Sequence, residues 1–248
     1  MAGQDEPGPR VGVGRSADVY DLGHGRVLRR YHDHTRSARG EAEIMSWAAA
    51  HGVPVPEVFD ADGPDIVMEK VDGPTMLADA ARRPWRLASH AALLARLHAQ
   101  VHAVPALDWL RAPFAGGRAG EGGGAGTVLL HLDLHPENVL LSARGPVVID
   151  WEGAARGPAE TDVALCWLVV ATSEVPGSAW QRAVGRAGQR LFADIVVRRS
   201  GLRVDAGWRA EAARFRLLDP HLRPGEAARV RRFLAQDDRA GESGESPA

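Results

Sequence analysis

The segment from residue 127 to residue 150 constrains the fold of this 248-residue chain more than any other part. It holds two compact apolar runs, residues 127–141 and 146–150, and the second run ends in Asp150. An apolar strand that ends in an acid places the carboxylate at the edge of a sheet, where it can face a cleft. The first run contains His131, Asp133 and Asn138. The segment therefore predicts a polar site built at the ends of short strands.

The polar residues of this segment have a spacing that suits one kind of chemistry. They read His-x-Asp-x₄-Asn, followed by a more distant Asp, which is the order found in kinases. Phosphoryl transfer needs a carboxylate that orients the attacking hydroxyl group, and hard oxygen ligands that hold Mg²⁺ against the phosphates. Asp133, Asn138 and Asp150 supply these groups in order.

Two other interpretations of the same residues stay open. His131, Asp133 and His135 alternate, so on a strand they share one face. Two imidazoles and one carboxylate can bind a metal, which would suit a metal-dependent hydrolase. Alternatively, Asp133 and Asn138 only build a turn.

The run from His131 to Leu140, His-Leu-Asp-Leu-His-Pro-Glu-Asn-Val-Leu, resembles the His-Gly-Asp-Leu-His-Pro-Gly-Asn-Val-Leu signature of the aminoglycoside phosphotransferase family. The triplet Ile149-Asp150-Trp151 is similar to the Ile-Asp-Trp motif of that family. Leu132 and Glu137 depart from the signature because the family usually has glycine at both positions. The resemblance covers about residues 11–170 and implies a two-lobed protein-kinase-like α+β fold.

The resemblance also implies roles for individual residues. Asp133 would be the catalytic aspartate, and Asn138 and Asp150 would hold Mg²⁺. His131 would pack behind the catalytic loop as a structural support, and Asp162 would also support that loop. From the sequence alone, Asp162 precedes an apolar run and looks like the N-cap of a helix. The expected reaction moves the γ-phosphoryl group of ATP to a hydroxyl group of a small molecule, an aminoglycoside-like antibiotic or a metabolite.

Residues 11–71 read as a small lobe of strands around one helix. The turn Gly23-His24-Gly25 predicts a tight hairpin, and Gly52 with Pro54 stops the helix. The expected elements are strands at Val19–Leu22, Arg26–Tyr31, Pro56–Asp60 and Asp65–Val71, and a helix at Arg36–His51.

The start of this lobe predicts a nucleotide site. The run from Val11 to Ser16, Val-Gly-Val-Gly-Arg-Ser, lets the backbone approach phosphates, and Ser16 can donate to them. The resemblance asks for a lysine on the strand that follows the hairpin, but the only lysine of the chain is Lys70. By register, Arg29 takes that position and Arg30 faces the other way. The alternative is that Arg29 is a solvated surface residue.

Three further residues of the nucleotide site follow from the resemblance. Glu41, on the predicted helix, would hold the strand cation, and Glu69 and Val71 would offer backbone groups to adenine. Because the usual lysine is missing, a nucleotide-binding pseudokinase with weak or no transfer is the main alternative function.

The rest of the chain reads as a larger helical lobe, residues 72–237. Helices are expected at Trp85–Val104 and at about 160–173, 178–199, 206–218 and 224–236, with a flexible Gly-rich linker at 115–126. Residues 1–10 and 238–248 are polar and predict a disordered leader and tail.

Composition limits the partners. A formal net charge of −2 argues against broad electrostatic binding of nucleic acid or an anionic membrane. No apolar run reaches the ~18 residues of a membrane span, and the start lacks the features of a signal peptide, so a cytoplasmic protein is expected. The single cysteine, Cys166, lies in an apolar run and predicts a buried, inert thiol. A cationic acceptor would need an acidic pocket, for which the candidates are Glu152, Glu160, Asp162, Asp219 and Asp237.

Overall fold

The computed structural model describes residues 8–114, 127–219 and 222–242, with side chains as far as residue 235. By its internal contacts the chain forms two compact units. Unit 1 comprises the residues up to Asp79 together with Glu137–Ala154, and unit 2 comprises Ala80–Pro136 together with the residues from Ala155 onward. The expected lobe boundary after Val71 falls inside unit 1, which also includes a later segment of the chain.

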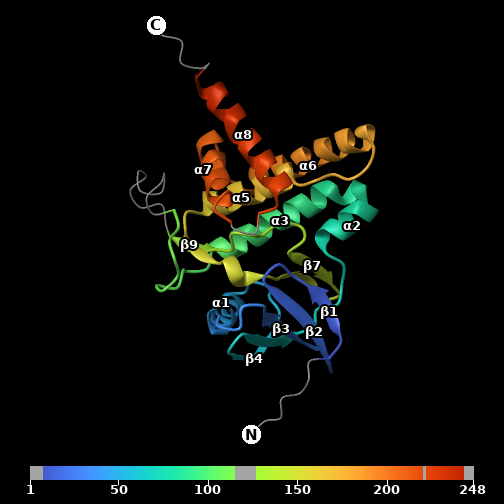
Figure 1. The fold of residues 1–248 in the computed structure, drawn as a ribbon, viewed down its shortest axis with the longest axis vertical. Coiled ribbons are helices and arrows are strands. Elements are labelled where there is room, and N and C mark those ends of the chain that lie inside the picture. The colour runs from blue at the N-terminus through green and yellow to red at the C-terminus, as the bar shows by residue number, and fades with distance from the viewer. Residues whose placement is uncertain (1–7, 115–126, 220–221, 243–248) are drawn as a thin grey trace. The chain divides into compact units, whose positions relative to one another are not determined.

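Unit 1 is built on a five-stranded antiparallel sheet with the strand order β1-β2-β3-β5-β4 (Figure 1). Its strands are β1 (Arg10–Val13), β2 (Ala17–Gly23), β3 (Arg26–Tyr31), β4 (Val58–Asp62) and β5 (Asp65–Glu69). The hairpin between β2 and β3 turns through Gly23, His24 and Gly25, whose φ angles are 73°, 50° and 74°. Two glycines make this left-handed turn inexpensive, as the sequence predicted.

The expected disordered leader is wrong at its C-terminal end. Arg10 begins β1 and pairs with Tyr20 of β2, and the Pro9 carbonyl accepts a hydrogen bond from the Asp21 N–H. A polar composition did not exclude this strand, because an edge strand needs only backbone partners on one side. Residues 1–7 lie outside the described residues.

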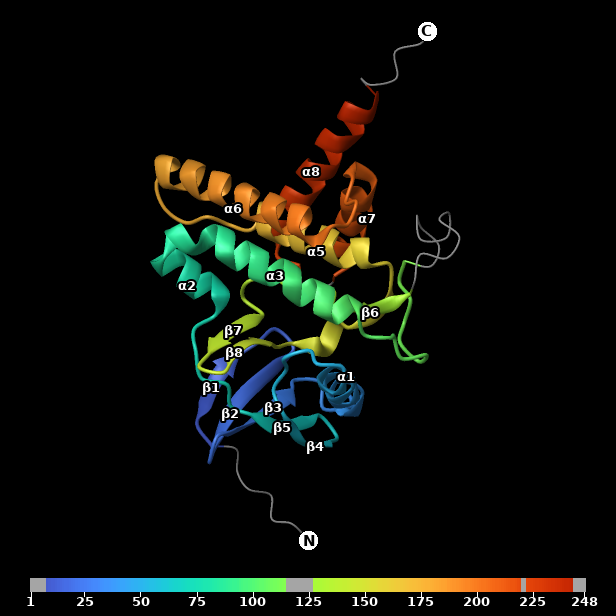
Figure 2. The same cartoon turned by 180° about the vertical axis from the view of Figure 1, so that it is seen from behind.

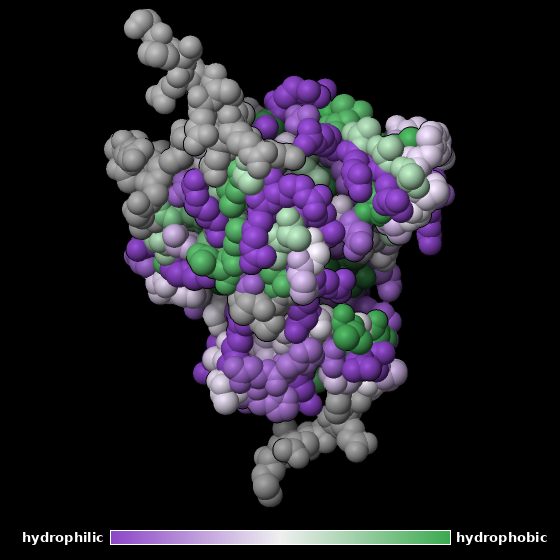
Figure 3. Space-filling model, turned by 45° about the horizontal axis from the view of Figure 1, so that its top comes forward, coloured by the Kyte–Doolittle hydropathy of each residue, from purple (hydrophilic) through white to green (hydrophobic). Residues whose placement is uncertain are grey.

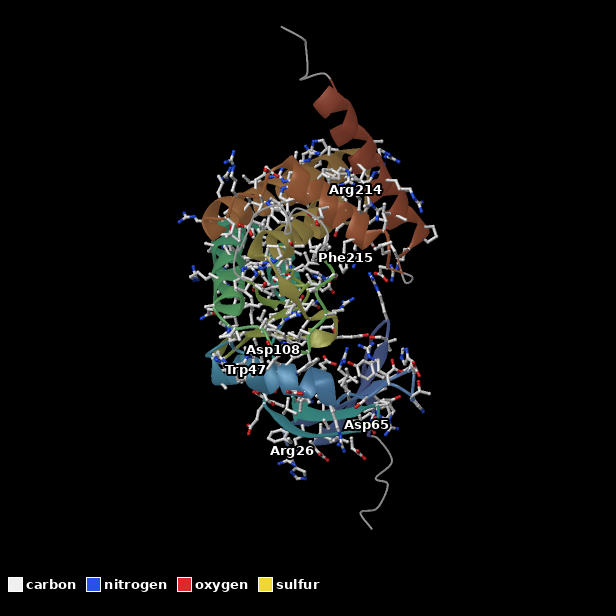
Figure 4. All side chains as sticks on the ribbon, turned by 90° about the vertical axis from the view of Figure 1, so that its left-hand side faces the viewer. Arg26, Trp47, Asp65, Asp108, Arg214 and Phe215 are labelled. Atoms are coloured by element: carbon white, nitrogen blue, oxygen red, sulfur yellow. The ribbon has the colours of Figure 1, made fainter. Side chains whose placement is uncertain are left out.

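Helix α1 (Arg39–Ala50) packs its apolar side into unit 1, where Ile44, Met45 and Ala48 are buried. The core of the sheet includes Tyr31 and Ile66. On the rim of the sheet, the Arg26 guanidinium lies 4.3 Å from the centre of the Phe59 ring, and Asp65 opens β5 (Figure 4).

A small hairpin, β7 (Val139–Ser142) and β8 (Gly145–Val148), completes unit 1. The Val148 N–H donates to the Pro54 carbonyl (2.7 Å), and the Leu141 N–H donates to the Pro74 carbonyl (2.9 Å). Gly73 allows this approach, because a Cβ there would lie 2.3 Å from the Leu141 carbonyl oxygen. These backbone bonds explain why residues 137–154 belong to the first unit.

Unit 2 is mainly helical. Helix α2 (Met76–Arg82) spans the division between the units and was not expected from the sequence. The other elements are η1 (Pro84–Arg86), α3 (Leu87–His102), β6 (Val128–Leu130), β9 (Ala155–Gly157), α5 (Ala159–Thr172), α6 (Ala179–Ser200), α7 (Ala206–Arg216) and α8 (Pro224–Glu242). All the later helices were expected, within a few residues, apart from the end of α8.

Helix α5 is the centre of unit 2. It is apolar on most sides, as a fully packed helix must be, and Val163, Leu165, Cys166 and Leu168 are buried. Helices α3 and α6 run beside it (Figure 2), and α7 also packs on it. The Phe215 ring at the end of α7 lies 4.8 Å from the Phe114 ring (Figure 4).

Helix α8 continues to Glu242, so the disordered tail expected from residue 238 is wrong for residues 238–242. Residues 243–248 and the Gly-rich segment 115–126 lie outside the described residues. The face drawn in Figure 3 mixes hydrophilic residues with hydrophobic areas. Among the described helices, none has the length and apolar character that crossing a membrane requires.

Candidate active site

Arg29 forms the centre of a polar cluster in unit 1. It lies in the middle of β3, opposite Val19 of β2 and Ile66 of β5, and only 8% of it is exposed. Its guanidinium donates to Glu41 of α1, to Asp150 (2.9 Å) and to Glu152 (3.2 Å). A solvated surface arginine is therefore the wrong interpretation of this residue.

Arg30 behaves as the register predicted. Strand alternation turns it to the other side of β3, where it makes a bidentate pair with Asp65 at 2.7 and 2.6 Å. Both side chains of this pair are about one third exposed (33% and 27%).

Burial and charge act against each other in the Arg29 cluster. Burial lowers the pKa of Arg29, but Glu41 and Asp150 outweigh it, so the guanidinium has a raised pKa and stays charged. Burial likewise raises the pKa of Glu41, against the opposing charge of Arg29 and a hydrogen bond from the Tyr31 hydroxyl. The cluster is a buried ion pair whose two members depend on each other.

Glu152 joins the predicted glycine loop to this cluster. Its carboxylate accepts hydrogen bonds from the Ser16 hydroxyl and from Arg36, in addition to Arg29. Burial raises the pKa of Glu152, but the hydrogen bond from Ser16 and the charge of Arg36 together lower it by more. The pKa is therefore below its usual value, and the carboxylate is ionised. Two cations and a hydroxyl group thus hold one anionic group. No sequence pattern pointed to Arg36, and Glu152 was expected only as one candidate for an acidic acceptor pocket.

The loop that carries Ser16 is a tight turn. The Gly14 N–H donates to the Ala17 carbonyl at 2.8 Å. A Cβ at residue 14 would lie 2.6 Å from the same oxygen, so the turn requires glycine. This turn sets the Ser16 hydroxyl on the Arg29 cluster.

The hairpin β7–β8 brings Asn138 and Asp150 to one place. Val139 pairs with Val148 at its open end, and the Ile149 N–H donates to the Asn138 carbonyl at 3.0 Å. Asp150 is the next residue and has a left-handed φ of 66°. An amide and a carboxylate that flank one hairpin end offer the hard oxygen atoms that Mg²⁺ prefers, so these residues fit such an ion.

In unit 2, the residues after β6 are held by Asp162. Its carboxylate accepts the backbone N–H groups of His131 (3.1 Å) and Leu132 (2.8 Å). Leu132 has a φ of 64°, a conformation that favours glycine. The predicted N-cap role of Asp162 is wrong, because Pro158 caps α5 and Asp162 lies in its first turn. The carboxylate is directed at another segment of the chain.

Asp133 follows these residues. Its N–H donates to His131 Nδ1 at 3.3 Å, and its Oδ1 lies 3.4 Å from His135 Nε2. Burial opposes the ionised form, but the hydrogen bond from His135 and the nearby charge of Arg216 leave the pKa of Asp133 below its usual value. Asp133 is therefore a carboxylate at neutral pH.

The three residues of the hydrolase alternative do not form a metal site. Within the described part of the chain, one group of at least three His, Cys, Asp or Glu side chains converges enough to hold an ion, and it is His98, His102 and Asp162. His131 is fully buried and uses Nδ1 for the backbone of Asp133.

The predicted hinge lies at the end of β5. The Glu69 N–H donates to the Glu57 carbonyl at 2.8 Å, and the Glu69 carboxylate pairs with Arg144 at 2.6 Å. Lys70 pairs with Asp21 at 2.6 Å on the surface. Val71 follows directly in the chain.

Several of the proposed acceptor acids have other partners. Asp162 binds the backbone, and Asp219 lies 3.4 Å from Arg216. The Asp237 side chain lies outside the described residues, and Glu160 lies in the first turn of α5.

Three comparisons place the chain among known proteins. The model of the "Phosphotransferase enzyme family" (APH) matches residues 8–121 and 118–213. No curated protein sequence matches the chain significantly. Many solved structures are similar to it in fold.

Three solved structures illustrate this similarity. A choline/ethanolamine kinase family protein from Mesorhizobium loti has a TM-score of 0.55 and 15% identity over 99% of this chain and 90% of its own. A thermostable mutant of aminoglycoside phosphotransferase APH(4)-Ia, in a ternary complex with AMP-PNP and hygromycin B, has a TM-score of 0.61 and 14% identity over 96% and 94%. The Plasmodium vivax ethanolamine kinase has a TM-score of 0.58 and 11% identity over 93% and 80%.

At these identities the solved structures establish the fold, which is the expected kinase-like α+β fold. The family model covers well over half of the chain, including the Arg29 cluster, the His131–Asn138 loop and Asp162. The chain therefore belongs to the APH phosphotransferase enzyme family, and it is a small-molecule phosphotransferase.

Proposed function

We propose that the protein transfers the γ-phosphoryl group of ATP to a hydroxyl group of a small molecule, with Mg²⁺ as the metal. The observation that carries the proposal is the buried guanidinium of Arg29, fixed by Glu41 and in contact with Asp150. A strand cation held by a helix glutamate is the arrangement that places positive charge on nucleotide phosphates in kinases.

Arg29 and Ser16 would bind the phosphates, with Arg36 as a second cation. All three now bind the Glu152 carboxylate, so the group that they select is anionic and oxygen-rich. Phosphate oxygens have the same character, and arginine binds them bidentately. The backbone of Glu69 and Val71 would hold adenine. One solved relative in fold binds AMP-PNP, as its description states.

Asn138 and Asp150 would hold Mg²⁺, which supplies positive charge against the phosphates when bound. Asp133 would orient the acceptor hydroxyl. Because its pKa is lowered, Asp133 is a weak base, and we expect it to position the hydroxyl group and to accept the proton late. Asp162 and His131 would fix the loop that carries it, through the backbone bonds described above.

The acceptor would be a small molecule with a free hydroxyl group, such as an aminoglycoside-like antibiotic or an amino alcohol. The solved relatives in fold include kinases for both kinds of compound, by their descriptions.

The test is Mg²⁺-dependent ADP release with a panel of aminoglycosides, macrolides, amino alcohols and sugars. Asp133→Asn should abolish release while ATP affinity, measured by calorimetry, is retained. Arg29→Met should weaken ATP binding itself, and Asp108→Asn, at an acid without a proposed role, should change neither. Release that persists in Asp133→Asn would remove that residue from the mechanism. ATP binding without turnover on any acceptor would favour a pseudokinase.

A further inference from the structure

A second cluster of ionisable residues lies in unit 2, around the Asp162 carboxylate that accepts the N–H groups of His131 and Leu132. His98 and His102 are one turn apart near the end of α3, and Asp162 faces them from the first turn of α5. His98 and Asp162 are completely buried, and only 9% of the His102 side chain is exposed. The proposed phosphoryl transfer uses neither histidine.

The three side chains converge closely. His102 Nε2 lies 3.0 Å from Asp162 Oδ2, and His98 Nδ1 lies 3.7 Å from the same oxygen. One ligand atom from each residue can be chosen so that all lie within 4.8 Å of one another. Two ligands of a tetrahedral Zn²⁺, each at about 2.0–2.1 Å from the metal, are ~3.3 Å apart. The two distances to Asp162 Oδ2, 3.0 and 3.7 Å, bracket that value.

His98 has only long contacts to polar groups, which are Asp162 Oδ2 at 3.7 Å from its Nδ1 and the backbone of Leu134. Neither of its ring nitrogens makes a hydrogen bond of normal geometry, although the side chain is fully buried. A buried polar atom without a partner costs about 1–3 kcal/mol. A ligand at the centre of the cluster would give Nδ1 a partner.

We propose that His98, His102 and Asp162 form a binding site for one divalent transition-metal ion, for which Zn²⁺ fits best. Imidazole nitrogen and carboxylate oxygen are the ligands that Zn²⁺ uses, and histidines four residues apart on a helix present their rings to one ion. Mg²⁺ prefers oxygen ligands, so it would not compete.

The charge of the cluster suits a cation. Burial opposes the ionised form of Asp162, but the hydrogen bond with His102 and the nearby His98 ring leave its pKa well below the usual value. Burial also lowers the pKa of His98, so its ring is neutral, which is the form that binds metals.

The second shell is already in place. The other carboxylate oxygen of Asp162 accepts the Leu132 N–H at 2.8 Å. Outer hydrogen bonds of this kind orient a metal ligand. The ion would thus be a structural centre that joins α3, α5 and the loop before Asp133, and it is separate from the Mg²⁺ site proposed at Asn138 and Asp150.

The experiment measures metal binding, so its outcome does not depend on the proposed phosphoryl transfer. Full-length protein is stripped with a chelator and titrated with Zn²⁺ by calorimetry and with Co²⁺ by visible absorption, in excess Mg²⁺. The variants are His102→Gln and His98→Gln. The matched control is His90→Gln, a buried histidine on the same helix. His135→Gln tests the segment around Asp133.

The expected result is one ion per chain in the wild type and in His90→Gln. His102→Gln and His98→Gln should each lose affinity by at least the ~10- to 100-fold that outer-shell changes cause. Circular dichroism checks that each variant is folded, and Zn²⁺ should raise the Tm of the wild type but not of a folded His102→Gln. Failure of stripped wild type to bind Zn²⁺ stoichiometrically would overturn the proposal, as would affinity lost only in His135→Gln.

Discussion

Replacing Arg29 by methionine tests whether the cluster in unit 1 is a buried ion pair. Arg29 and Glu41 are 8% and 7% exposed, and methionine keeps much of the arginine volume without its charge. The variant leaves the Glu41 carboxylate buried without its cation. Breaking a buried pair in this way typically costs about 3–5 kcal/mol. Loss of the bonds to Asp150 and Glu152 adds little to this loss of stability, because those side chains are 42% and 23% exposed.

A double variant and a control variant test whether the lost stability comes from the Arg29–Glu41 ion pair. Arg29→Met combined with Glu41→Leu removes both charges, so most of the lost stability should return. A double-mutant cycle should then give a coupling free energy of at least about 2–3 kcal/mol. Arg30→Met is the matched control, since Arg30 is the neighbouring arginine on the opposite face and its pair with Asp65 is partly exposed. We expect it to cost no more than about 1 kcal/mol.

The assay is equilibrium unfolding in urea, which does not screen charges as guanidinium chloride does. The free energy of unfolding is compared for the wild type, the three single variants and the double variant. The ion-pair account is refuted if Arg29→Met lowers the free energy of unfolding no more than Arg30→Met does. It is also refuted if the loss in the double variant equals the sum of the losses in Arg29→Met and Glu41→Leu.

Three further predictions concern unit 2. His135 lowers the pKa of Asp133, so kcat/KM should stay level on the acid side down to about pH 5, and His135→Gln should move the acid limb to higher pH; an unmoved limb would contradict this contact. Leu132→Gly should be more stable than Leu132→Ala by about 1 kcal/mol in urea, because residue 132 has a positive φ; the reverse order would show that the loop carries no strain. Cys166 is buried and its thiol pKa is raised, so a thiol reagent should modify it only after urea unfolding; rapid reaction of the native protein would place the thiol at the surface.

The sequence predicted the elements of the fold well, for a local reason. Alternation and the Gly-His-Gly turn identify β2 and β3, and helical spacing identifies α1 and α3, because these patterns depend on neighbouring residues only. It missed β1 and α2, which are short and carry weak patterns. The order of Asp133, Asn138 and Asp150 likewise appears in the sequence, since they lie within eighteen residues of one another.

Only the tertiary structure decided which side chains share a partner. Arg29 meets Glu41, Asp150 and Glu152 because a strand, a helix and a later hairpin pack together in unit 1. Asp162 binds the Leu132 N–H thirty residues away, so its place in the chain suggested a cap that does not exist. His98 and His102 carried no signal, since two histidines on a helix gain meaning only when a carboxylate from another helix is packed against them. Such contacts depend on burial between distant segments, which no local pattern specifies.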